Sequence, residues 1–88
     1  MKNYKFIITG KVQGVFYRAS VKANALKANF KGYVKNLPDK SVEACVSCEE
    51  NELPTFIEIL KKGSKQSEVL NIKQEEIDTL FMTPFEVR

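Results

Sequence analysis

The chain has 88 residues, enough for one small domain with one modest hydrophobic core, and we expect residues 1–88 to form a single domain. Hydrophobic residues make up 43% of it and charged residues 28%, as in ordinary globular proteins, while a net charge of +3 is too small and too dispersed to indicate binding of nucleic acid. No apolar stretch could span a bilayer and the N-terminus lacks a leader pattern, so we expect a cytoplasmic protein, a monomer, with no membrane partner.

The first half of the chain reads as a strand, a helix and a hairpin. Alternating aromatic and β-branched residues predict a strand over Tyr4–Thr9, and helical periodicity with a high alanine content predicts a helix over Tyr17–Phe30. We expect Gly32 to end that helix, because glycine is the usual terminator. A second strand over 32–36 and a third over Val42–Cys48 then form a hairpin, joined by a turn that contains Pro38 and Asp39.

The second half reads as a helix and one or two strands. Apolar residues at positions 53, 56, 57 and 60 follow helical spacing, Pro54 fits only the first turn, and Gly63 ends the helix. A fourth strand is predicted over Glu68–Glu76, with Leu70 and Ile72 on one face and Val69 on the other. A short strand over 82–87 is expected to close an edge of the sheet.

This order of elements is typical of one fold class. Strand, helix, strand, strand, helix, strand is the split βαβ arrangement of the ferredoxin-like sandwich. We therefore predict an α+β protein with the order βαββαβ, in which two helices cover one face of an antiparallel sheet and the other face stays open.

Several kinds of site are excluded by composition. The chain has no histidine, which excludes Ser-His and Cys-His nucleophile pairs and every metal site that needs an imidazole. Cys45 and Cys48 have C-x-x-C spacing, but they fall in a predicted strand, where residues three apart point to opposite faces. We expect neither a disulfide between them nor a metal site.

The segment that leaves the first strand and enters the first helix carries most of the chemistry. It reads G-K-V-Q-G-V-F-Y-R from Gly10 to Arg18. A glycine-containing turn presents bare backbone N–H groups, and a helix start adds partial positive charge. Arg18 adds a planar fork that fits phosphate oxygens, and the only other arginine of the chain is Arg88 at the C-terminus. This combination predicts an anion site.

A second polar residue is expected close to this turn. The helix runs away from Arg18 and the second strand returns antiparallel to it, so Asn36 should lie at the same end of the domain. An asparagine side chain can both donate and accept hydrogen bonds. Arg18, Asn36 and the N–H groups of the turn could thus hold a phosphoryl group and a water molecule.

The same residues resemble a known family. V-Q-G-V-F-Y-R at 12–18, G-Y-V-K-N at 32–36 and F-E-V-R at 85–88 are similar to the motifs of the acylphosphatases, over essentially the whole chain. The resemblance implies the ferredoxin-like fold and the hydrolysis of the carboxyl–phosphate bond in small acyl phosphates, without a metal or cofactor. Inorganic phosphate would be both a product and a competitive inhibitor.

Site residues follow from the resemblance position by position. It implies that Arg18 binds the phosphate and that Asn36 orients the attacking water. It also implies a phosphate-binding loop whose backbone N–H groups contact the phosphate oxygens, formed by Gln13, Gly14, Val15, Phe16, Tyr17 and Arg18. Because a carboxylate is a good leaving group, this scheme needs no strong general acid and is compatible with a chain that lacks histidine.

Other interpretations remain open at this stage. The glycines could simply permit a tight turn, Asn36 could be an ordinary turn residue, and Gln13 could cap local backbone. The chain could be a non-catalytic domain of this fold that binds an anion or a protein, or an RNA-binding sheet, although the third strand offers no aromatic residue. The chain also has Lys40 and Cys48 where the family commonly has glycine, which leaves the local loop geometry open.

Overall fold

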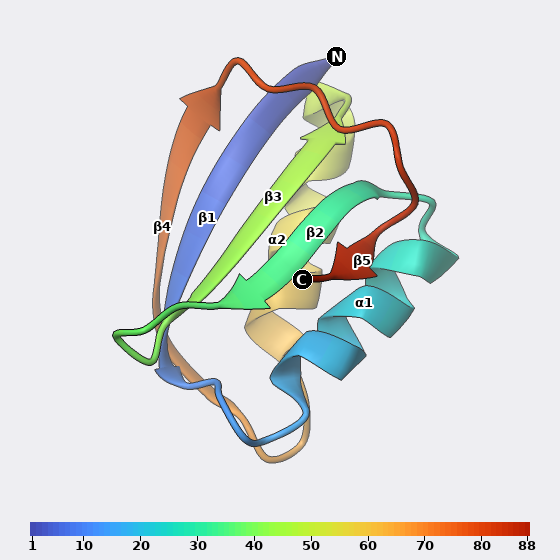
Figure 1. The fold of residues 1–88 in the computed structure, drawn as a ribbon. Helices are drawn as coiled ribbons and strands as arrows, with labels where there is room; N and C mark the ends of the chain where they lie inside the picture. Colours follow the sequence, from blue (N-terminus) through green and yellow to red (C-terminus); the bar gives the residue numbers. More distant parts are fainter.

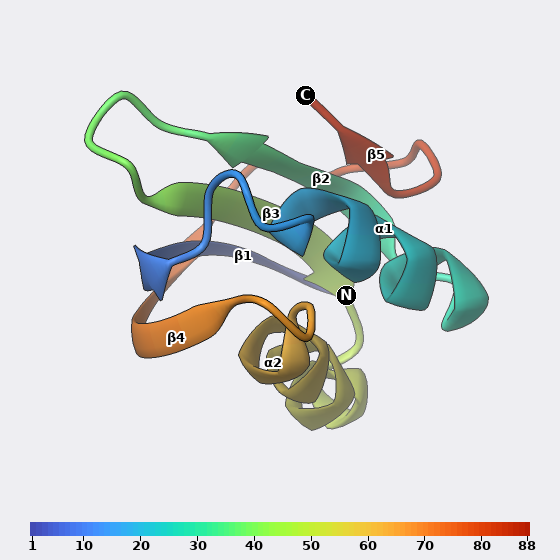
Figure 2. The ribbon, with the colours of Figure 1, turned by 90° about the horizontal axis from the view of Figure 1, so that it is seen from below.

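The sheet and its two helices are arranged in two layers. The computed structural model describes residues 1–88, and both helices lie on the same face of the sheet (Figures 1 and 2). In chain order the elements are β1 (Lys2–Lys11), α1 (Tyr17–Lys27), β2 (Lys31–Asn36), β3 (Val42–Cys48), a one-turn 3-10 helix (Glu50–Glu52), α2 (Leu53–Lys62), β4 (Glu68–Ile77) and β5 (Glu86–Val87). The predicted order of elements is confirmed.

The strand order in the sheet is β4-β1-β3-β2-β5. The first four strands pair antiparallel, as expected for the ferredoxin-like class, whereas the two-residue β5 pairs in parallel with β2 at the edge. The sheet is therefore mixed. The predicted terminal strand is shorter than expected because Pro84, which has no N–H to donate, makes only an isolated bridge to Lys31 before β5 begins.

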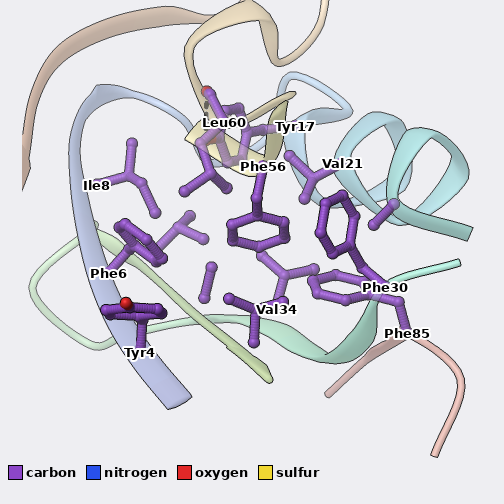
Figure 3. Packing of buried hydrophobic residues seen from close by; sticks show 14 of the residues in the cluster. Tyr4, Phe6, Ile8, Tyr17, Val21, Phe30, Val34, Phe56, Leu60 and Phe85 are labelled. Carbon is purple, nitrogen blue, oxygen red and sulfur yellow. Dashed lines mark hydrogen bonds between the residues drawn. The ribbon is translucent and has the colours of Figure 1, made fainter. Parts of the chain in front are cut away.

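Aromatic rings fill the space between the sheet and the helices (Figure 3). Phe56 of α2 lies near the centre, with its ring centroid 5.5 Å from that of Phe6, 5.1 Å from Phe30 and 5.8 Å from Phe85. Phe6 belongs to β1 and Phe56 to α2, while Phe30 directly precedes β2 and Phe85 directly precedes β5. The core thus joins both ends of the chain to the central strands.

The end of α1 differs from the prediction. The helix ends at Lys27, and Asn29 takes a left-handed conformation with φ of 61°. The N–H groups of Asn29 and Phe30 donate to the carbonyls of Leu26 and Ala25, which is the Schellman pattern of a helix end. Gly32 is instead inside β2, where a Cβ atom would lie 2.0 Å from the carbonyl oxygen of Cys45. Close approach of two strands, and not helix termination, requires that glycine.

The facing of residues in β4 was also predicted wrongly. Val69 and Ile72 both pack against the core, while Leu70 is 72% exposed. The register of β4 on β1 shifts between Thr9 and Gly10, so that one extra residue enters β4. A bulge of this kind reverses the alternation on one side of it.

The face of the sheet away from the helices is not open at its centre. All seven residues of β3 are buried, including Cys45 and Ser47, which point away from the helices. After β4 the chain crosses the ends of β1 and β3 (Figure 1), and the N–H of Phe81 donates to Ser47 Oγ over 2.8 Å. This segment covers part of the face that we expected to be free.

Cys45 and Cys48 are both buried free thiols, as expected for residues that point to opposite faces of one strand.

Tyr4 and Phe6, the aromatic residues of β1, point into the core beneath the helices. They are therefore not available to stack on bases, which removes the main support for an RNA-binding sheet.

Candidate active site

The loop between β1 and α1 adopts an unusual backbone conformation. Gly14 has φ of 73°, and Phe16, the residue before α1, has φ of 62° and ψ of 20°. A left-handed conformation is unfavourable for a residue with a large side chain. The ring of Phe16 is 72% exposed, so burial of the ring does not compensate for this strain. Alternation of right- and left-handed residues turns successive N–H groups toward one side, as in an anion-binding nest.

The N–H groups of this loop have no partners in the protein. None of the backbone N–H groups from Gln13 to Arg18 donates to a protein acceptor. No side chain caps the start of α1, and its first turn holds no acidic residue. Six backbone donors and the positive end of the helix dipole are therefore available to an anion at this loop.

Two side chains fix the loop to segments that are distant in the sequence. Gln13 Nε2 donates to the carbonyl oxygens of Leu37 and Ser41, over 2.9 and 2.8 Å, and so joins the loop to the turn between β2 and β3. On the other side, Ser64 Oγ donates to the carbonyl oxygen of Val15. The side chain of Gln13 does not cap its own loop but caps the neighbouring turn. Its contribution to an anion site is therefore limited to its backbone N–H.

Tyr17 provides a further anchor beneath the loop. Its hydroxyl donates to the carbonyl oxygen of Leu60 near the end of α2, over 2.7 Å, and burial raises its pKa well above the usual value. Gly63 follows α2 with φ of 47°, and a Cβ there would lie 2.6 Å from the Tyr17 ring. Because the hydroxyl stays protonated and buried, Tyr17 contributes structure and a backbone N–H, and not acid–base chemistry.

Arg18 is the second residue of α1 and is half-buried. The ion pairs of the protein involve the N-terminus, lysines and Arg88, and Arg18 takes part in none of them. It lines a hollow of about 310 Å³ together with loop and helix residues, namely Val12, Gly14, Phe16, Tyr17 and Ala19. A guanidinium without a counterion thus lies beside the unpaired N–H groups.

Asn36 ends β2, directly before the residue whose carbonyl accepts from Gln13. Its Oδ1 is buried and has no hydrogen-bond partner, and its side chain makes no hydrogen bond within the turn. Leaving a buried acceptor unpaired costs about 1–3 kcal/mol, so such an atom usually has a ligand or water as partner. The interpretation of Asn36 as an ordinary turn residue is not supported by these contacts.

The turn after Asn36 is held by other residues. Asp39 Oδ1 accepts hydrogen bonds from the hydroxyl and the N–H of Ser41, and these bonds lower the pKa of Asp39. Lys40 adopts φ of 74°, the conformation for which glycine is preferred. The lysine therefore takes the strained conformation itself.

Figure 1 places the parts of this site at one end of the molecule, where α1 begins and β2 ends. The hydrogen bond from Gln13 to Leu37 links the two segments directly.

The sequence did not predict Ser64 as a contributor, because its only signal is a serine after the glycine that ends α2. A larger hollow, of about 640 Å³, lies elsewhere, lined mainly by charged and polar residues of the two helices and their ends.

Comparison with known proteins identifies the family. The family model described as Acylphosphatase matches residues 4–87. The chain belongs to the acylphosphatase family. An acylphosphatase of Methanocella arvoryzae is 40% identical over 88 residues, the full length of both chains. The resemblance seen in the sequence is thus confirmed.

Solved structures of acylphosphatases agree with the fold. The crystal structure of acylphosphatase from Bacillus subtilis superposes with a TM-score of 0.92 at 37% identity, over 100% of this chain and 99% of that one. The structure of an acylphosphatase from Coxiella burnetii gives a TM-score of 0.89 at 36% identity, over 99% and 92% of the two chains. None of the helices in this member of the family is long and apolar enough to cross a membrane.

Proposed function

We propose that this chain hydrolyses the carboxyl–phosphate bond of small acyl phosphates to a carboxylate and inorganic phosphate. One observation carries the proposal: six unpaired backbone N–H groups and an arginine without a counterion lie at the same end of the molecule (Figure 1) as a buried acceptor, Asn36 Oδ1, that lacks a donor. The donors suit the phosphate, and the acceptor suits a water molecule. The family and its motifs support the same reaction.

In the proposed mechanism the loop N–H groups and Arg18 bind the phosphate oxygens. Asn36 Oδ1 accepts a hydrogen bond from a water molecule and directs the oxygen of that water at phosphorus. A new P–O bond forms in line with the bond that breaks, and the carboxylate leaves with the bonding electron pair. The protons of the water end on inorganic phosphate or in solvent. Positioning and charge stabilisation supply the catalysis, so no metal or cofactor is required.

Asn36 also argues against a domain that merely binds an anion. A carbonyl oxygen that faced a phosphate directly would repel it, because both are acceptors. A water molecule between them provides the missing donor. The buried, unpaired Oδ1 is therefore better suited to catalysis than to simple anion binding.

The proposed reaction is tested by phosphate release from acetyl phosphate with the purified chain in excess chelator. We expect turnover to persist, and inorganic phosphate to inhibit competitively because it occupies the same loop. Loss of activity on chelation with recovery on addition of Mg²⁺ would contradict the mechanism. Absence of turnover in every condition would contradict the function itself.

The proposal also covers the domain organisation, the location and the oligomeric state of the chain. We expect residues 1–88 to act as a single domain, in the cytoplasm and as a monomer. Two buried free thiols are typical of a reducing compartment, where disulfides are rare. Light scattering on the purified chain tests the monomer, and a dimer at assay concentrations would contradict it.

A further inference from the structure

We propose that the groove between the two helices is a docking surface for an acidic peptide segment of a partner protein. This helix groove is the hollow of about 640 Å³ that lies between Asn24, Lys27 and Ala28 on one side and Thr55, Ile59 and Lys62 on the other. A second hollow, of about 370 Å³, shares Asn24 and Lys62 with it and extends it past the end of α2. None of the phosphate-loop residues 13–18 lines either hollow, so the inference goes beyond the proposed hydrolysis.

The helix groove lies on the sides of α1 and α2 that are turned away from the core. Its lining positions on α2 are 55, 58, 59 and 62, which follow helical spacing, whereas the buried Phe56 and Leu60 of the same helix point into the core. Figure 2 shows the two helices next to each other on one face of the sheet. The groove is therefore an outer surface of the helical layer, and a macromolecule can reach it.

Four lysines surround the helix groove, and only one of them has an acidic partner. Lys61 lies 4.0 Å from Glu58, whereas Lys27, Lys62 and Lys65 take part in no ion pair. The helix dipole favours a cation in the last turn of each helix, but it does not account for four cations around one groove. Anions bound between these exposed lysines would relieve their mutual repulsion.

The bottom of the helix groove is apolar, which distinguishes it from a plain basic surface. Ala28 and Ile59 are partly buried and pack against the core beneath them. Beside them, Asn24 and Thr55 can donate hydrogen bonds to backbone amide groups and accept hydrogen bonds from them. The lining thus matches an occupant with several carboxylates, a backbone and an apolar side chain.

An acidic peptide fits these features better than a nucleic acid does. No aromatic residue lines either hollow, so unpaired bases would have no ring on which to stack. α2 has 10 residues and is about 15 Å long, a length that about five residues of extended peptide would span. One exposed lysine–carboxylate pair changes affinity by about fivefold or less, so the segment needs several acidic residues.

The test is a titration of the protein, saturated with phosphate, into a fluorescein-labelled peptide of sequence E-D-E-L-E-D-E, followed by fluorescence anisotropy. Saturation keeps the peptide from binding at the phosphate loop. We expect this peptide to bind about tenfold or more tightly than Q-N-Q-L-Q-N-Q, and binding to weaken as salt is added. Equal binding of the two peptides would overturn the proposal.

A pair of variants with the same net charge locates the binding. Lys27→Gln combined with Lys62→Gln should weaken binding of the acidic peptide about tenfold. Lys31→Gln combined with Lys73→Gln is the matched control, because both lysines are exposed, have no ion pair and lie outside the two hollows. Its affinity should stay within about twofold of the wild type. Equal losses in the two variants would show attraction by net charge alone and would overturn the docking surface.

Two further readouts make the result specific. In NMR titrations the peptide should shift the backbone signals of residues 24, 28, 55 and 59, and shifts confined to other surfaces would refute the groove. A single-stranded oligothymidylate that displaced the peptide and bound more tightly would refute the choice of an acidic peptide. Hydrolysis of acetyl phosphate by the Lys27→Gln, Lys62→Gln variant should match that of the wild type, so the docking surface and the proposed function can fail independently.

Discussion

Arg18 and Arg88, the two arginines of the chain, are in opposite situations. Arg88 Nε donates to Glu86 over 2.7 Å, and its guanidinium lies 4.2 Å from the centroid of the Tyr33 ring. Arg18 has neither a carboxylate nor a hydrogen-bond partner in the protein. An arginine that stabilises the fold has its partners within the fold, so the unpaired arginine is the one available to a ligand.

Replacement of each arginine by lysine distinguishes the arginine that is available to a ligand from the one that is paired within the fold. Arg18→Lys keeps the charge but loses the two-point fork, so we expect phosphate affinity to fall and turnover to drop by roughly 10² or more. Arg88→Lys, the matched control, should change turnover less than threefold. Steady-state kinetics and calorimetric titration with phosphate measure both effects. Equal losses in the two variants would contradict a specific role for Arg18.

Asn36 has a different expected signature, because it carries no charge. Asn36→Ala should lower kcat by roughly 10² or more while phosphate affinity changes little. It also removes a buried unpaired acceptor, so the free energy of unfolding should stay the same or rise. Denaturant titration beside the kinetics checks both parts. A folded variant with normal kcat and weakened phosphate binding would refute the role in orienting water.

The ionisation of Tyr17 should make the stability of the protein depend on pH. Its pKa is raised by burial, so protonated Tyr17 is favoured in the folded state. The stability that protonated Tyr17 contributes is fully present below pH 10, which is near the pKa of tyrosine in the unfolded chain. It is lost as pH rises above 10 toward the higher pKa of Tyr17 in the folded protein. Tyr17→Phe should cost about 1 kcal/mol at neutral pH, because it removes the hydrogen bond to Leu60. It should also reduce the loss of stability between pH 10 and 12, as urea unfolding at each pH would measure. A variant as sensitive to alkaline pH as the wild type would contradict this assignment.

At the scale of the elements, the predicted helices and strands follow from periodicity. The apolar stripe of α2 and the alternation in β3 both depend on local spacing, and both were located correctly. The end of α1 and the facing of β4 were not. Asn29 can terminate a helix as glycine does, and the bulge depends on the pairing with Gly10, which local spacing does not contain. The first error thus came from a local helix terminator other than glycine, and the second from a tertiary contact.

The loop between β1 and α1 depends on the segment after α2. The hydroxyl of Ser64 fixes the orientation of the Val15 carbonyl, and the N–H of Phe16 belongs to the same peptide group. Ser64→Ala should therefore weaken phosphate binding about tenfold and raise KM. Ser67→Ala is the matched control, because Ser67 Oγ contacts only backbone groups of Ser64 and not the loop. If both variants raise KM equally, Ser64 acts only through the local turn.

At the scale of the whole molecule, the chain's fold class, its family and the proximity of two site segments could be predicted. Arg18 and Asn36 are recognisable because helix and strand lengths bring them to one end of the sheet. The role of the Gln13 side chain could not be predicted, since it depends on carbonyls 24 and 28 residues away. Arg18, Asn36 and the loop donors remain predictions until their variants are measured.

The hydrogen bonds from Gln13 to the β2–β3 turn make ligand binding a property of the complete fold. The anion loop keeps its shape only while strands β1, β2 and β3 are assembled, so an unfolded chain has no comparable site for phosphate. Phosphate should then act as a folding ligand. At about 100 times its Kd it should stabilise the protein by about 2.7 kcal/mol, and each kcal/mol raises the Tm of a domain this small by about 4–8 °C. A thermal melt with and without phosphate would reveal this, and Gln13→Ala should lose most of the increase. The product of the proposed reaction would thus also raise the resistance of this small protein to unfolding.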